Sequence, residues 1–134
     1  MTSRFDDIQD LVLKDARKEY SETTIDFFMN PRNHGPMEDA DGFGTVTGPC
    51  GDTMNMWIRV KDGIIEKASF TTDGCGTSIA SASMATVMVT GKTLEEASLI
   101  GQNDVLSALG GLPLESEHCA ALASRVIRAA IKDL

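Results

Sequence analysis

The middle of the chain alternates apolar and polar side chains. Apolar residues stand at every second position from Met54 to Val60, which is the period of a half-buried strand. Asp62-Gly63 follows, a pair typical of a tight hairpin turn because its glycine tolerates positive φ. We therefore predict a return strand over Ile64–Thr72 and a third strand over Phe43–Thr47.

On both sides of this hairpin the apolar pattern becomes helical. Asn30-Pro31 ends a first short helix, because a residue before proline resists the helical region. Thr93 and Glu96 have the spacing of a capping box. The predicted helices cover Ser21–Met29, a segment from Thr77 to a stop at Gly91, a segment opened by Thr93, Asn103–Leu109, and a long last helix after a cap at Ser116. The order predicts an α+β fold: a three-stranded antiparallel sheet with helices packed on one face and a long C-terminal helix.

The first 19 residues form a separate N-terminal extension in this interpretation, followed by one domain over residues 20–134. Apolar residues within Arg4–Tyr20 recur at helical spacing. The segment is either a docked or frayed terminal helix or an arm that binds a partner.

Composition narrows the class of protein. A chain of 134 residues suits one compact domain. Its net charge of −8 argues against nucleic acid as a partner, because phosphate binding needs a basic surface. No apolar run approaches the roughly 20 residues that span a membrane, and no signal pattern opens the chain. We therefore expect a cytoplasmic protein without a membrane partner, whose three cysteines are reduced.

Two of the cysteines are placed symmetrically about the predicted hairpin. Cys50 precedes Asp62-Gly63 by as many residues as Cys75 follows it. If the strand pairing runs to the open end, the two thiols face each other there, with Cβ atoms about 5 Å apart. A one-residue slip would spoil this pairing but leave the thiols close.

Each cysteine also has unusual neighbours. Cys50 lies in a glycine-flanked loop two residues before Asp52, Cys75 stands between glycines directly before a helix, and Cys119 follows His118 in the first turn of the last helix. A helix N-terminus favours the thiolate, so we predict a lowered pKa for Cys75 and Cys119.

These thiols admit several interpretations. Any single cysteine can be a small buried hydrophobe, and Cys50 with Cys75 could form a disulfide. Three thiolates with Asp52 or His118 make a soft ligand set that suits zinc or an iron–sulfur cluster, and no paired C-x-x-C zinc spacing is present. A harder fourth ligand would make a cluster easier to release.

Two further classes of protein are a structural zinc domain and a cysteine hydrolase that uses Cys119. His118 is a poor base for such a hydrolase, because adjacent helical residues point about 100° apart.

At these residues the sequence resembles the U-type iron–sulfur cluster assembly scaffolds, the family of IscU and the NifU N-terminal domain. The matching segments are Tyr20-Ser21-Glu22 with Asn30-Pro31-Arg32-Asn33, Gly48-Pro49-Cys50-Gly51-Asp52, Gly74-Cys75-Gly76-Thr77-Ser78-Ile79-Ala80-Ser81, Gly91-Lys92-Thr93-Leu94-Glu95-Glu96-Ala97 and His118-Cys119.

The resemblance implies a scaffold, not an enzyme, that assembles a [2Fe–2S] cluster from iron and sulfur and transfers it to apo iron–sulfur proteins. It implies that Cys50, Cys75 and Cys119 ligate the cluster, with Asp52 or His118 as the fourth ligand. Asp52 is then tied to cluster lability and iron entry, and Cys119 accepts sulfur from a PLP-dependent cysteine desulfurase. Zinc occupies the same ligands in cluster-free members, and Tyr20 matches a tyrosine linked to homodimer formation.

Two departures from the family pattern modify these expectations. Where IscU proteins carry Leu-Pro-Pro-Val-Lys, which a specialised Hsp70-type chaperone grips, this chain has Leu112-Pro113-Leu114-Glu115-Ser116. The lysine is missing and an acid is present, which argues against that chaperone as a partner. The extension before Tyr20 is longer than in IscU. The alternative function is that of a zinc-bound, SufU-like sulfur acceptor for a cysteine desulfurase, although the SufU insertion before the last cysteine is absent.

Overall fold

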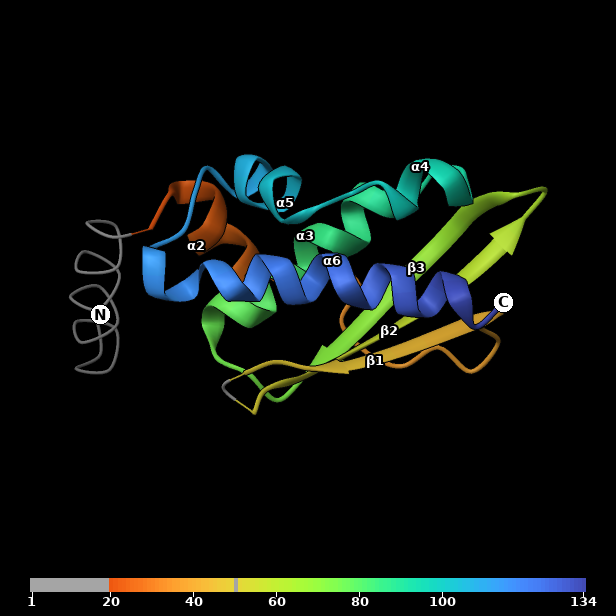
Figure 1. The fold of residues 1–134 in the computed structure, drawn as a ribbon, viewed down its shortest axis with the longest axis horizontal. Coiled ribbons are helices and arrows are strands. Elements are labelled where there is room, and N and C mark those ends of the chain that lie inside the picture. The colour runs from red at the N-terminus through yellow and green to blue at the C-terminus, as the bar shows by residue number, and fades with distance from the viewer. Residues whose placement is uncertain (1–19, 50) are drawn as a thin grey trace, which may run out of the picture.

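Three antiparallel strands form one sheet, and the helices cover one of its faces. The computed structural model describes residues 20–49 and 51–134, so the predicted extension and Cys50 lie outside the described residues. The strands are β1 (Gly42–Thr47), β2 (Thr53–Lys61) and β3 (Ile64–Thr72), in the order β1-β2-β3. Figure 1 shows the long last helix α6 (Glu117–Lys132) running across the sheet. The predicted α+β fold is confirmed.

The helices begin and end close to their predicted positions. Besides α6 they are α2 (Glu22–Met29), α3 (Gly76–Val89), α4 (Leu94–Ser98), α5 (Gln102–Leu109) and the short 3₁₀ helix η1 (Leu114–Ser116). The predicted capping box of Thr93 and Glu96 opens α4. Ser116 precedes α6 as predicted, but its side chain makes no capping hydrogen bond. The reason is that η1 leads directly into α6, so Ser116 does not adopt the extended backbone of a capping residue.

A bulge in β3 changes the register of the hairpin. Val60 pairs with Ile65, as the two-residue turn predicts, but Arg59 pairs with Lys67. The extra residue lets Ile65 and Ala68 both face the helices, and both are almost fully buried. Beyond the bulge every pair is one residue out of the predicted register, and the ladder ends at Met54 and Thr72. The described ladder thus stops before Cys75 and is one residue out of the symmetric register, because core packing overrides the symmetry of the turn. The predicted pairing of positions 50 and 75 stays a prediction, since Cys50 lies outside the described residues.

Helix α6 approaches the sheet most closely over β1. A Cβ atom built on Gly44 would lie 2.4 Å from the Ala130 nitrogen, and one on Gly42 would lie 2.5 Å from the Ala130 oxygen. Only glycine leaves room for backbone at these distances. The contact holds the C-terminal half of α6 close against β1.

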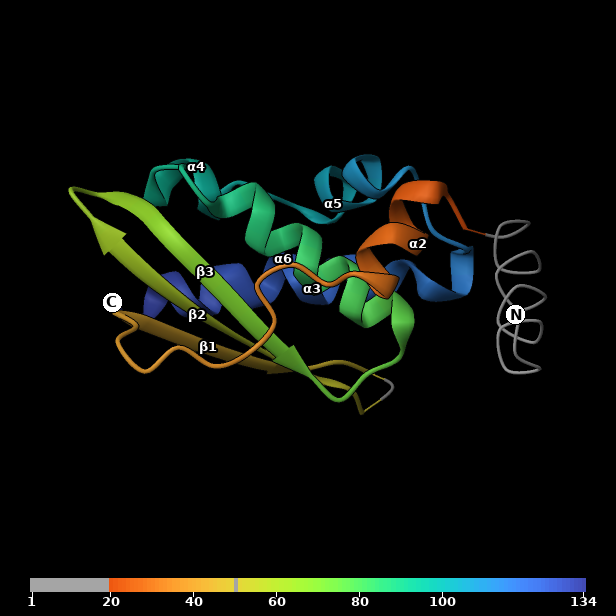
Figure 2. The same cartoon turned by 180° about the vertical axis from the view of Figure 1, so that it is seen from behind.

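The core lies between the sheet and the helices α3 and α6, where the buried side chains include Met54, Met56, Ile58, Phe70, Val126 and Ile127. None of the described helices lies on the other face of the sheet, which is crossed by the loop of residues 33–41 (Figure 2). A bridge between His34 and Phe70 ties this loop to β3. None of the described helices is both long and apolar enough to cross a membrane.

Candidate metal centre

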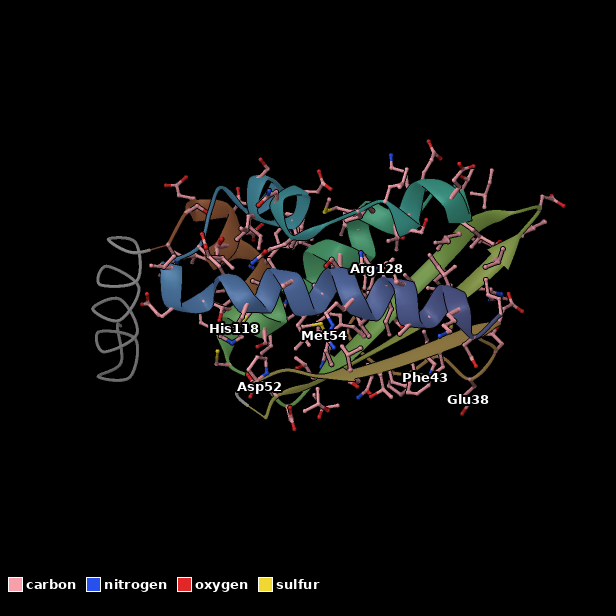
Figure 3. All side chains as sticks on the ribbon, viewed as in Figure 1. Glu38, Phe43, Asp52, Met54, His118 and Arg128 are labelled. Carbon is pink, nitrogen blue, oxygen red and sulfur yellow. The ribbon has the colours of Figure 1, made fainter. Side chains whose placement is uncertain are left out.

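Three segments far apart in the sequence meet at the open end of the β2–β3 hairpin. They are the loop of residues 48–52, the N-terminus of α3 and the first turn of α6, and Figure 3 shows His118 and Asp52 at this same end. The loop folds back on itself, because Gly48 N donates to Asp52 O over 2.8 Å and Gly51 N donates to Gly48 O over 3.0 Å. Gly51 has a φ of 86°, a value that glycine adopts without strain. The turn presents Asp52 toward α3; Cys50 itself is not among the described residues.

Cys75 is the residue that caps α3. Its backbone is extended, and its carbonyl oxygen accepts the first helical hydrogen bond from Ile79 N over 3.0 Å. The thiol is a free, exposed group with Thr77 Oγ1 3.1 Å from its sulfur. Partial burial raises the pKa of Cys75, but hydrogen bonds from Thr77 and Ser78 outweigh it and hold the pKa below its ordinary value. The predicted lowered pKa is confirmed for this cysteine.

Cys119 is the opposite case. Its thiol is free, but only 1% of the residue is exposed. Burial raises the pKa of Cys119, and hydrogen bonds with Ser78 and Thr77 offset this only in part. The predicted lowered pKa is therefore wrong, because the packing of α6 on α3 removes from water the turn whose N-terminus was expected to favour the thiolate.

Asp52 is linked to the buried thiol of Cys119 through the hydroxyl of Ser78. Its Oδ2 accepts a long hydrogen bond of 3.4 Å from Ser78 Oγ, and this serine oxygen lies 3.4 Å from Cys119 Sγ. The neighbouring Gly74 is required for this approach, because a Cβ there would lie 2.4 Å from Ser78 Oγ and 3.0 Å from Asp52 Oδ2. The carboxylate, the exposed thiol of Cys75 and the buried thiol of Cys119 thus converge on the start of α3.

Two hydroxyl groups that connect these side chains were not predicted from the sequence. Thr77 Oγ1 lies 3.1 Å from Cys75 Sγ and 3.4 Å from Cys119 Sγ. The only sequence signal for Thr77 and Ser78 was their position in the first turn after Gly74-Cys75-Gly76. Which sulfur they reach depends on how α6 packs, and local pattern does not contain that information.

His118 lies closer to Cys119 than helical geometry suggested. Its Nε2 is 3.7 Å from Cys119 Sγ, so the ring reaches the sulfur although the two residues are adjacent in α6. Direction along the helix is therefore no argument against His118 as a base. The state of Cys119 is the better argument against a hydrolase, because burial and a raised pKa are the reverse of an activated nucleophile.

The donor set has the chemistry of a site for soft metals. Thiolates with one carboxylate or imidazole suit zinc and iron–sulfur clusters. Over residues 20–49 and 51–134, no three thiol, imidazole or carboxylate residues lie close enough together to hold a metal ion. Among these residues His118 lies 3.7 Å from the Cys119 sulfur, and Cys75 and Asp52 are linked to that sulfur through Thr77 and Ser78. Cys50, the third thiol of the predicted set, stands two residues before Asp52 in the sequence.

The structure is thus a small α+β domain with two described thiols and a carboxylate at the open end of its sheet. The sequence matches the family described as NifU-like N terminal domain over residues 19–134. The chain belongs to this family, and the resemblance noted in its motifs is confirmed.

Curated relatives agree with this assignment. Two proteins of Archaeoglobus fulgidus, named iron–sulfur cluster assembly scaffold proteins IscU 1 and IscU 2, are each 53% identical over 85% of this chain and 75% of their own length. The IscU scaffold protein of Escherichia coli K12 is 48% identical over 85% of this chain and 92% of its own length.

Solved structures share the fold. The protein designated FiSufU from Fervidobacterium islandicum AW-1 superposes with a TM-score of 0.68 at 21% identity, over 84% of this chain and 96% of that one. The N-terminal part of a NifU-like protein from Brucella abortus gives a TM-score of 0.67 at 17% identity, over 84% and 92%. At these identities the two structures show the fold alone.

Proposed function

We propose that this protein is a scaffold on which a [2Fe–2S] cluster is built from iron and desulfurase-derived sulfur and then handed to apo-proteins. The observation that carries the proposal is the convergence of Cys75, Cys119 and Asp52 on one hydroxyl pair, in a chain about half identical to proteins named IscU scaffolds. The cluster is cargo in this proposal, and the protein binds and releases it without turning over an organic substrate.

The proposed cluster ligands are Cys50, Cys75 and Cys119, with Asp52 or His118 as the fourth. Both candidates for the fourth position lie near Cys119: the histidine 3.7 Å from its sulfur, and the aspartate on the far side of Ser78. A carboxylate is a harder ligand for iron in a sulfide cluster than a thiolate is. Asp52 as a ligand would therefore leave one corner of the cluster easy to exchange, as a scaffold requires.

Sulfur enters, in this proposal, as a persulfide on a cysteine desulfurase. The thiolate of Cys119 attacks the outer sulfur, a new S–S bond forms on Cys119, and the desulfurase cysteine leaves as a thiolate. Since Cys119 is buried, docking has to open the first turn of α6 before the transfer. Cys75 is exposed with a lowered pKa and is the acceptor that competes with it.

The remaining partners follow the same proposal. We place the protein in the cytoplasm, where thiols stay reduced, with a cysteine desulfurase and apo iron–sulfur proteins as partners and a homodimer that involves Tyr20. An Hsp70-type chaperone is not among the proposed partners. Leu114 is 82% exposed in the corresponding segment, but the acid Glu115 stands beside it, and Ser116 occupies the position at which a lysine is expected.

The test is anaerobic reconstitution with ferrous iron, cysteine and a cysteine desulfurase, followed by visible absorption and Mössbauer spectra. Wild type and Asp52→Ala are compared, with Asp39→Ala as the matched control, since Asp39 pairs with Arg59 away from the site. We expect a [2Fe–2S] spectrum in all three, transfer to apo-ferredoxin from wild type and Asp39→Ala, and slower transfer from Asp52→Ala.

A different result would favour the SufU-like alternative, in which zinc is held and the protein only accepts sulfur. The same thiols with a carboxylate or imidazole suit zinc as well, and we propose zinc as the occupant of the cluster-free protein. If no cluster forms in wild type while zinc stays bound and a persulfide still appears on the protein, the zinc-bound sulfur acceptor replaces the scaffold.

A further inference from the structure

Two hydroxyl groups at the start of α3 stand between the groups that the proposed function needs. Thr77 Oγ1 lies within hydrogen-bonding distance of both Cys75 Sγ and Cys119 Sγ, at 3.1 and 3.4 Å. Ser78 Oγ lies 3.4 Å from Cys119 Sγ and 3.4 Å from Asp52 Oδ2. Cys119 is thus linked to the exposed thiol by one hydroxyl and to the carboxylate by the other.

The position of these hydroxyls is fixed by the fold. Thr77 is 6% exposed and Ser78 is fully buried, both in the first turn of a 14-residue helix that packs against β3 and α6. Buried hydroxyls keep hydrogen-bond partners, because an unsatisfied one costs about 1–3 kcal/mol. Here the partners of Thr77 and Ser78 are the thiols and the carboxylate of the site. The hydrogen bonds of the two hydroxyls therefore favour particular orientations of these side chains.

Helix packing alone does not explain a hydroxyl at these positions. One turn further along α3, Ser81 is also fully buried, and its Oγ has no hydrogen-bond partner among the described residues. A serine of this helix is therefore buried here without a hydrogen bond from its side chain. Ser78 differs from it in what its oxygen contacts: a thiol on one side and a carboxylate on the other.

We propose that Thr77 and Ser78 are positioning residues, which hold the Cys119 thiol toward Cys75 and Asp52 so that these groups can share one metal ion or cluster. The Cys119 side chain has a single torsion with three staggered positions, and the two hydrogen bonds favour the position in which Sγ faces both hydroxyls. Hydrogen bonds from outside the ligand shell orient metal ligands in this way in many proteins. The inference rests on the proposed function, because it assumes that the thiols bind metal.

Four variants separate positioning from packing. Thr77→Val keeps the volume of threonine and removes its hydroxyl, whereas Thr77→Ser keeps the hydroxyl and removes a methyl group. Ser78→Ala removes the other hydroxyl. Ser81→Ala is the matched control: the same change, in the same helix, at the same burial, without a partner to lose.

Two measurements are made on each folded full-length variant. The first is anaerobic titration with cobalt(II) alone, followed by thiolate-to-cobalt charge-transfer absorption. The second is the Hα–Hβ coupling constants of Cys119 in the metal-free protein, which report its χ1 rotamer. We expect Thr77→Val and Ser78→Ala to bind cobalt about 10-fold more weakly or worse and to show averaged couplings. Thr77→Ser and Ser81→Ala should match wild type in both.

The outcomes distinguish this inference from the proposed function. If wild type binds cobalt and Thr77→Val and Ser78→Ala bind it as tightly, positioning by the hydroxyls is wrong while the metal site stands. If Ser81→Ala weakens binding as much as Ser78→Ala, the effect belongs to helix packing and the inference is also wrong. If wild type binds no cobalt, the proposed function fails, and the coupling constants alone decide whether the hydroxyls orient Cys119.

Discussion

At the scale of single residues, the two described cysteines lie in different environments, which shift their pKa in opposite directions. Cys75 is exposed at a helix N-terminus, and hydrogen bonds from Thr77 and Ser78 hold its pKa below the ordinary value despite partial burial. Cys119 is buried in the first turn of α6, where loss of hydration raises its pKa. The two sulfurs share Thr77 as a neighbour but differ in exposure and in the direction in which their pKa is shifted.

This difference predicts the order in which the thiols of the metal-free protein react. Only the thiolate is alkylated, so near neutral pH Cys75 should react with iodoacetamide faster than Cys119, on the order of 10-fold or more, since each pKa unit changes the thiolate fraction tenfold. As the pH rises through the raised pKa of Cys119, the ratio of the Cys75 rate to the Cys119 rate should fall. Peptide mass spectrometry over a time course measures both rates.

Unfolding in urea is the control for that experiment, because it removes the burial and the hydrogen bonds that separate the two thiols. The rates of Cys75 and Cys119 should then converge. Equal rates in the folded protein would contradict the assignment of distinct environments to them.

At the scale of elements, the site depends on how α6 is seated on β1. The helix backbone comes so close to Gly42 and Gly44 that a Cβ would meet backbone atoms of Ala130. Farther toward the site the two elements diverge, and a Cβ on Gly48 would make only ordinary contact with the Leu122 side chain at 3.4 Å. The close contact is thus at one end of α6, while Cys119 and His118 lie at the other.

Gly44→Ala should destabilise the protein, because the added methyl group meets backbone that cannot rotate away. Overpacking of this kind costs about 1–3 kcal/mol in the free energy of unfolding, measured by urea denaturation. Gly48→Ala is the matched control, on the same chain segment and against the same helix, and should change stability by less than about 0.5 kcal/mol. If the two substitutions lowered the free energy of unfolding equally, the close approach of α6 to Gly44 would not be the cause of the destabilisation.

At the scale of the whole molecule, the apolar core extends well beyond the candidate site. Phe70, Met54 and Ile58 from the sheet and Val126 from α6 are almost fully buried, and the site lies at one end of the sheet. A structural zinc domain, by contrast, draws its folding free energy from the metal. The extent of the apolar core predicts a protein that stays folded when metal is removed.

The protein should keep a cooperative unfolding transition after exhaustive chelation under reducing conditions. Bound zinc is expected to raise the midpoint by mass action alone, since it binds the folded state preferentially. Circular dichroism during a urea titration, with and without added zinc, measures both effects. Loss of the folded state on chelation would contradict a cargo role and favour a structural zinc domain.

Local patterns along the chain were sufficient to predict most of the helices and strands and the family. Alternation from Met54 to Val60, the Asp62-Gly63 turn and the Thr93 capping box encode local structure through contacts between near neighbours, so they were readable without a fold. The motifs around Cys75 and Cys119 predicted the family for the same reason: each is a short run of adjacent residues.

Features that depend on packing between elements could not be predicted from local patterns. They are the strand register, the pKa of Cys119 and the contacts of Thr77 and Ser78. The bulge in β3 follows from the need to bury both Ile65 and Ala68, and it moved the register away from the symmetry of the turn. The raised pKa of Cys119 follows from the seating of α6 on α3, which removes water from a helix N-terminus. The roles of Thr77 and Ser78 follow from distances to residues about 26 to 42 positions away, and such distances exist only once the chain has folded.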